Sequence, residues 1–119
     1  MIDHVSIRVS DMGKSKKFYT AALSTVGYVL ESEDSSYAGF RAVDGSSLWL
    51  VKEDYVTHGA HVAFPVASEE AVQNFYDTAI AAGGTDNGAP GPRPEYGDYY
   101  GGFVKDMDGN NIEAVKRSI

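Results

Sequence analysis

The most constraining feature of this sequence is an internal repeat. Two stretches of the chain match each other at a constant spacing of 57 residues. The matched positions are His4-Val5 and His61-Val62, Phe18-Tyr19 and Phe75-Tyr76, and Gly27 and Gly84. Further on the spacing is larger: Gly39-Phe40 recurs at Gly102-Phe103 and, after one extra turn residue, Asp44-Gly45 recurs at Asp108-Gly109. Repetition at this length predicts two copies of one supersecondary unit.

The first copy predicts a strand, a helix and three further strands. Residues 4–9 alternate apolar with polar side chains, which is typical of a strand. Asp11 is placed to cap a helix that runs to about Thr25. Three strand-like runs follow at 28–33, 37–43 and 46–52, with an Asp-Gly hairpin turn between the last two.

The second copy repeats this order. Residues 61–66 predict a strand, and Ser68 is placed to cap a helix with one apolar stripe. Residues 85–98 are rich in Gly and Pro, with a short strand near Thr85. Residues 99–115 read as strand, tight polar turn and strand. Each unit then has a helix on one face of a four-stranded sheet, and two free faces curling together would enclose a cavity.

Length and composition narrow the class of protein. With 119 residues, we expect a single domain over 1–119, made of one unit at 2–52 and another at 60–117. The formal net charge of -7 argues against a nucleic-acid partner. The chain has no cysteine, so it has neither disulfides nor thiolate metal ligands. We see no signal peptide and no apolar run of about 18 residues, and we expect a cytoplasmic protein without a membrane partner.

One carboxylate needs an explanation. Glu113 stands between Ile112 and Ala114 in the last predicted strand, where an unpaired charge would be costly. Arg8 and Arg41 are possible partners. His4 and His61 are others, because they occupy equivalent positions on the polar face of the first strand of each unit.

Three segments carry a family resemblance: DHVSIRVSDMGKSKKFY, HVAFPV and FVKDMDGNNIEAV. Together they resemble the vicinal oxygen chelate superfamily, which contains glyoxalase I, bleomycin-resistance proteins, extradiol dioxygenases and fosfomycin-resistance enzymes. The resemblance covers roughly residues 2–116, with Met107 where the family usually has Pro in the turn. It implies an α+β fold in which two tandem βαβββ units form a curved mixed sheet around a cavity.

The resemblance also implies a metal site. The family's ligand positions fall on His4, His61 and Glu113, a set suited to Zn, Ni, Mn or Fe. Glyoxalase I has a fourth ligand, a Glu, in its first unit. The repeat maps Glu113 onto Trp49 at that position, and Trp cannot bind a metal. Trp49 would instead offer a stacking surface, although ordinary sheet packing explains it equally well.

Further substrate contacts are expected near this site. Arg8 shares a strand face with His4 and could hold an anionic substrate group or form a structural salt bridge. Arg93, Tyr99 and Tyr100 lie in or just after the Gly/Pro-rich loop, and such loops often rim a site. Simple packing is the alternative for the tyrosines.

The resemblance implies a glyoxalase-like, metal-dependent lyase or isomerase that acts on a small oxygenated or thiol-conjugated molecule. Glu113 would be its catalytic proton shuttle. A metal-free protein that binds small molecules such as drugs, and an Fe(II) extradiol-type dioxygenase, are the alternatives. The resemblance also implies a homodimer, and the sequence leaves open whether the site closes within one chain or between two.

Overall fold

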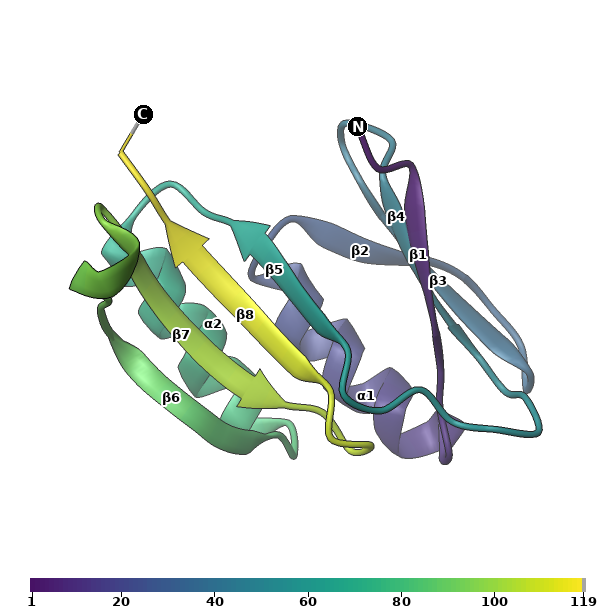
Figure 1. Cartoon of the computed structure of the whole chain (residues 1–119). Coiled ribbons are helices and arrows are strands. Elements are labelled where there is room, and N and C mark those ends of the chain that lie inside the picture. The colour runs from purple at the N-terminus through teal and green to yellow at the C-terminus, as the bar shows by residue number, and fades with distance from the viewer. Residues whose placement is uncertain (119) are drawn as a thin grey trace.

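Two four-stranded sheets, each covered on one face by a helix, make up the part of the protein that the structure describes (Figure 1). The computed structural model describes residues 1–118. The first unit consists of β1 (His4–Arg8), α1 (Met12–Ser24), β2 (Tyr28–Glu33), β3 (Tyr37–Ala42) and β4 (Ser47–Val51). The second consists of β5 (His61–Pro65), α2 (Glu69–Ala81), β6 (Thr85–Pro92), a short 3-10 turn (Pro94–Tyr96), β7 (Tyr100–Lys105) and β8 (Asn111–Lys116).

The two sheets have the same topology. Their strand orders are β1-β4-β3-β2 and β5-β8-β7-β6, and in each sheet the first strand runs parallel to the last while the other pairs are antiparallel. The predicted α+β class and the tandem βαβββ units are therefore confirmed. Within residues 1–118 no strand pair joins one sheet to the other, so the sheets are separate and do not close into a barrel. The two units instead meet through α1 and α2.

The strand register confirms the equivalence that the repeat predicts between Trp49 and Glu113. Trp49 lies opposite Ser6 on β1, and Glu113 lies opposite Ala63 on β5. The register also corrects the position of the extra residue. Gly39 pairs with Trp49, and Phe103 pairs with Glu113, so Gly39 and Phe103 are equivalent. The spacing between the two copies is therefore already 64 residues in β3 and β7, before the last turn. The insertion precedes β7.

Both helices begin where their caps predict. The Asp11 carboxylate accepts a hydrogen bond from the Lys14 amide at 3.0 Å, and the Ser68 hydroxyl accepts one from the Ala71 amide at 3.1 Å. Their apolar faces pack on the sheets around fully buried aromatic side chains: Phe18, Tyr19, Phe40 and Phe75. No helix within residues 1–118 is long and apolar enough to cross a membrane.

Strand β6 is longer than the sequence predicted. It runs from Thr85 through Pro92, across Gly88 and Gly91, where its register against β7 shifts. It is the edge strand of its sheet, and an edge position needs fewer amide donors, so it tolerates Pro and irregular pairing. This explains how a Gly/Pro-rich segment that suggested a loop forms a strand.

The polar turn between β7 and β8 connects the second unit to the first. The Tyr19 hydroxyl of α1 donates to Asp106 at 2.5 Å, and the Ser10 hydroxyl donates to Asp108. The Asn110 amide donates to the Thr57 carbonyl in the connector at 2.9 Å. These bonds fix the turn against α1 and the connector, and so fix the position of the adjoining strand β8.

Candidate functional site

Glu113 lies on the face of the second sheet that α2 leaves free. Its neighbours Ile112 and Ala114 belong to the core, so alternation along β8 directs Glu113 the other way. The side chain is nevertheless fully buried, because two residues cover it. His61 Nε2 lies 2.7 Å from Oε1, and the Tyr99 hydroxyl donates to Oε2.

The arginine alternatives for Glu113 are not realised. The Arg41 Nε donates to Glu31 at 2.9 Å on the first sheet. The Arg8 guanidinium lies over the Tyr55 ring, 4.8 Å from its centroid. Glu113 is thus paired with the histidine that the repeat predicted and with a tyrosine from the Gly/Pro-rich loop.

Gly101 makes the contact between Tyr99 and Glu113 possible. A Cβ atom on Gly101 would lie 3.0 Å from the Tyr99 ring and 3.1 Å from Glu113 Oε2. Both distances are shorter than ordinary carbon contacts, so a side chain at this position would push the two groups apart. Burial, together with the hydrogen bond and charge of Glu113, raises the pKa of Tyr99 to about 12. Tyr99 therefore stays a hydrogen-bond donor through neutral pH.

His4 lies on the other sheet and is exposed. Its Nδ1 lies 2.8 Å from an Asp3 carboxylate oxygen, and 57% of its side chain is accessible. A carboxylate on Nδ1 orients the ring and leaves Nε2 free to bind a metal ion, the arrangement usual for metal-binding histidines. No three His, Asp or Glu side chains of residues 1–118 are grouped closely enough to hold a metal ion.

The residues of one chain therefore fit a divalent cation only in part. His61 and Glu113 are adjacent, and an imidazole and a carboxylate are suitable ligands for Zn, Ni, Mn or Fe. The third expected ligand, His4, has the right chemistry but is not in the same cluster within residues 1–118.

Trp49 lies flat on the free face of the first sheet. A Cβ atom on Gly39 would come within 2.6 Å of its six-membered ring, so the indole rests on the glycine backbone. The indole Nε1 donates to the Ser47 hydroxyl at 3.0 Å, and Tyr37 packs beside the ring at a centroid distance of 5.9 Å. Trp49 therefore forms an aromatic patch on the same strand face as His4 and Arg8.

Arg8 has no acidic partner among the residues that the structure describes. None of the carboxylates of residues 1–118 forms an ion pair with it, and its Nε is buried without a hydrogen-bond acceptor in this part of the chain. Its backbone amide donates to the Thr57 hydroxyl at 2.9 Å, which ties the connector to β1. In a chain of net charge -7, an arginine left without a carboxylate retains the capacity to bind an anion.

The two other predicted contact residues have partners of their own. Arg93 donates to the carbonyls of Ala89 and Gly91 at 2.8 and 2.9 Å, and so supports the irregular strand β6. Tyr100 accepts a hydrogen bond from Gln73 of α2 at 2.9 Å. It therefore lies on the helix side of the sheet, opposite to Tyr99 and Glu113.

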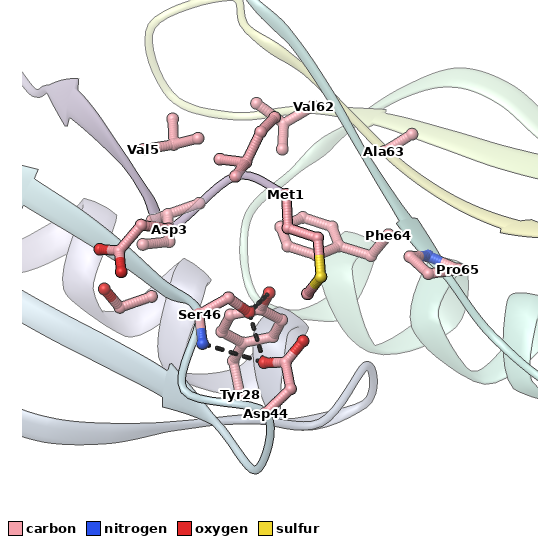
Figure 2. A pocket seen from close by; sticks show the side chains of 13 residues that line it. Met1, Asp3, Val5, Tyr28, Asp44, Ser46, Val62, Ala63, Phe64 and Pro65 are labelled. Carbon is pink, nitrogen blue, oxygen red and sulfur yellow. Dashed lines mark hydrogen bonds between the residues drawn. The ribbon is translucent and has the colours of Figure 1, made fainter.

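A cavity of about 320 Å³ lies between the two units (Figure 2). Tyr28 and Asp44 of the first unit and Val62 and Phe64 of the second line it, together with Met1. None of the three expected metal ligands lines this cavity. It is therefore distinct from the site at Glu113.

Three contributors to these sites were not predicted from the sequence: Asp3, Tyr55 and Gly101. Asp3 directly precedes His4, and this adjacency was a signal that could have been read. Gly101 and Tyr55 act through contacts between strands and the connector, which no local pattern reports.

Comparison with known proteins agrees with the fold and the repeat. The family model described as Glyoxalase/Bleomycin resistance protein/Dioxygenase superfamily matches residues 1–114. This chain belongs to that superfamily. No curated protein matches the sequence.

Solved structures extend this comparison. A glyoxalase/bleomycin resistance protein from Albidiferax ferrireducens T118 is 32% identical, with 99% of each chain covered and a TM-score of 0.86. A family enzyme from Burkholderia phytofirmans PsJN is 18% identical, with 98% of each chain covered and a TM-score of 0.78. The fosfomycin resistance protein FosX from Listeria monocytogenes is 20% identical, with 100% of this chain and 94% of that chain covered and a TM-score of 0.76. The last two show a shared fold.

Proposed function

We propose that this protein is a glyoxalase-like, divalent-metal-dependent lyase or isomerase that acts on a small oxygenated or thiol-conjugated molecule. We further propose that its site forms between two copies of the chain, with His61 and Glu113 from one copy and His4 from the other. The observation that carries the proposal is the 2.7 Å contact between His61 Nε2 and the fully buried Glu113 carboxylate.

The burial of Glu113 supports a functional role. Burying a carboxylate costs stability even when it is hydrogen-bonded, and an apolar residue in a strand would avoid that cost. The cost is understandable if the carboxylate binds a cation. His61 beside it supplies a second ligand of the right kind, as membership of the superfamily leads one to expect.

The position of His4 supports a site shared by two copies. His4 is exposed on the free face of one sheet, and the His61–Glu113 pair lies on the free face of the other. A second copy that packs its first sheet over the second sheet would bring His4 to this pair, and the reverse contact would form the same site again. This is the closed, two-fold arrangement usual for homodimers.

A divalent cation bound there would supply Lewis-acid polarisation of a substrate oxygen. Glu113 is the group we assign to proton transfer, because its carboxylate lies in the ligand cluster and is shielded from water. His61 lies against Oε1 and orients it. Arg8 and Trp49 lie on the sheet face that carries His4, where they would contact an anionic group and an apolar group of the substrate.

Metal analysis tests the proposal directly. Wild-type protein incubated with Zn, Ni, Mn or Fe and then desalted should retain metal, whereas His4→Ala, His61→Ala and Glu113→Ala should each lose most of it. His58→Ala is the matched control, because His58 is an exposed histidine in the connector. Retention of metal by all three ligand variants would refute the proposed site.

Subunit mixing tests whether the site is shared. His4→Ala and Glu113→Ala proteins are unfolded together and refolded, so that mixed dimers form. If the site is shared, each mixed dimer has one intact ligand set out of two. Random pairing makes about half of the dimers mixed, so about a quarter of the wild-type metal capacity should return. A site within one chain restores none.

A metal-free binding protein is the second candidate. It is favoured by the aromatic patch of Trp49 and Tyr37, and by the absence of a three-ligand cluster within residues 1–118. Wild-type protein that retains no metal but whose Trp49 fluorescence changes on adding small aromatic compounds would favour this function over the lyase.

A further inference from the structure

Tyr99, for which the loop position predicted a substrate contact, reaches Glu113. Its hydroxyl is directed at Glu113 Oε2 and donates a hydrogen bond to it. A hydroxyl has one proton to donate, and here that proton is used on a residue of the site. Tyr99 can therefore donate a hydrogen bond to a substrate only by giving up the bond to Glu113.

Tyr99 is held in this position from several sides. Its carbonyl accepts a hydrogen bond from the Arg93 amide at 2.8 Å, which fixes the backbone. Its ring packs against Tyr96, with centroids 5.1 Å apart, and the Arg117 guanidinium lies 4.7 Å from the ring centroid. Gly101 leaves open the space that the ring crosses to reach Glu113.

The two carboxylate oxygens of Glu113 are therefore different. Oε2 is occupied by Tyr99, and Oε1 is directed toward His61. We infer that Tyr99 is the positioning residue of Glu113, fixing the carboxylate so that Oε1 alone is presented beside His61 to a bound cation. The cation in this inference rests on the proposed function, whereas the hydrogen bond does not.

A hydroxyl deletion tests this role. Tyr99→Phe keeps the ring and removes the donor, and Tyr100→Phe is the matched control because the neighbouring Tyr100 hydroxyl contacts Gln73 on the opposite face. Titration with Zn or Mn should show that Tyr99→Phe binds about 10–100-fold more weakly than wild type, the usual effect of losing a residue that orients a metal ligand. Tyr100→Phe should bind within about twofold of wild type. Equal or tighter binding by Tyr99→Phe would overturn the inference.

A second measurement needs no metal. In metal-free protein, Tyr99→Phe leaves a buried carboxylate oxygen without its donor, so the unfolding equilibrium constant should rise about tenfold. In a Glu113→Leu background the same substitution should have no such effect, because the two residues act as a pair.

The two measurements separate the claims. Wild-type protein that binds no metal refutes the proposed function, and Tyr99 is then judged by unfolding alone. Independent effects of Tyr99→Phe and Glu113→Leu on unfolding would overturn the inference even if metal binds.

Discussion

The hydrogen bond between Tyr19 and Asp106 should contribute measurably to stability because it joins the two units through the core. Tyr19 is fully buried on α1, and Asp106 is 5% exposed in the turn between β7 and β8. Asp106 also accepts bonds from the amides of Asp108 and Asn110 and from the Asn110 side chain, each at 2.9 Å. Tyr19→Phe removes one of four donors and leaves the ring in place.

The expected loss follows from this geometry. A hydrogen bond to a charged group contributes about 1.5–3 kcal/mol, and three remaining donors favour the lower end of that range. We therefore expect Tyr19→Phe to lower the free energy of unfolding by about 1.5–2 kcal/mol. For a chain of this length the corresponding decrease in Tm is about 6–8 °C.

Urea unfolding followed by circular dichroism at pH 7.5 measures this loss. Tyr28→Phe is the control, because its hydroxyl bonds the uncharged Ser46 hydroxyl at 2.6 Å and should contribute only about 0.5–1.5 kcal/mol. A Tyr19→Phe loss below that of Tyr28→Phe would refute the argument that a charged, buried acceptor makes this contact the stronger one.

Three further predictions concern pH and the two glycines under aromatic rings. Burial, followed by the charge of Asp106, raises the pKa of Tyr19 well above its ordinary value near 10. The unfolded chain therefore loses this proton first, and wild type should lose about 1.4 kcal/mol of stability per pH unit above pH 10 that Tyr19→Phe does not lose. Equal losses of stability by wild type and Tyr19→Phe above pH 10 would contradict this prediction. Gly101→Ala should displace the Tyr99 ring and weaken Zn binding about tenfold, as measured by the metal titration described for Tyr99→Phe. An unchanged affinity for Zn would show that the ring can move without cost. Gly39→Ala should lift the indole of Trp49, lower the free energy of unfolding by about 1–3 kcal/mol and change the fluorescence of Trp49. An unchanged emission spectrum would show that the indole does not rest on Gly39.

The sequence was sufficient for the architecture because local signals and the repeat agreed. Alternation specified the strands, and Asp11 and Ser68 specified the helix starts. The register then confirmed the equivalence of Trp49 and Glu113. Strand β6 was underestimated because Gly and Pro argue against a strand everywhere except at a sheet edge, and edge position is a property of the assembled sheet.

The site could be predicted only in part. His61 and Glu113 come together because β5 and β8 are neighbours, a pairing that the repeat implies. The contact between Tyr99 and Glu113 depends on the space above Gly101, which is a tertiary property. The separation of His4 from this pair depends on how the two sheets are placed around α1 and α2, which no pattern along the chain encodes.

The equivalence of Trp49 and Glu113 has a consequence for substrate orientation. Two identical units would present two like surfaces to a ligand held between them, so that the ligand could bind in either of two orientations. Here one member of the related pair is a buried carboxylate with hydrogen-bonded oxygens, and the other is a flat indole. A molecule held between two such surfaces would meet a polar wall on one side and an apolar wall on the other. Divergence at this single position would therefore favour one binding orientation.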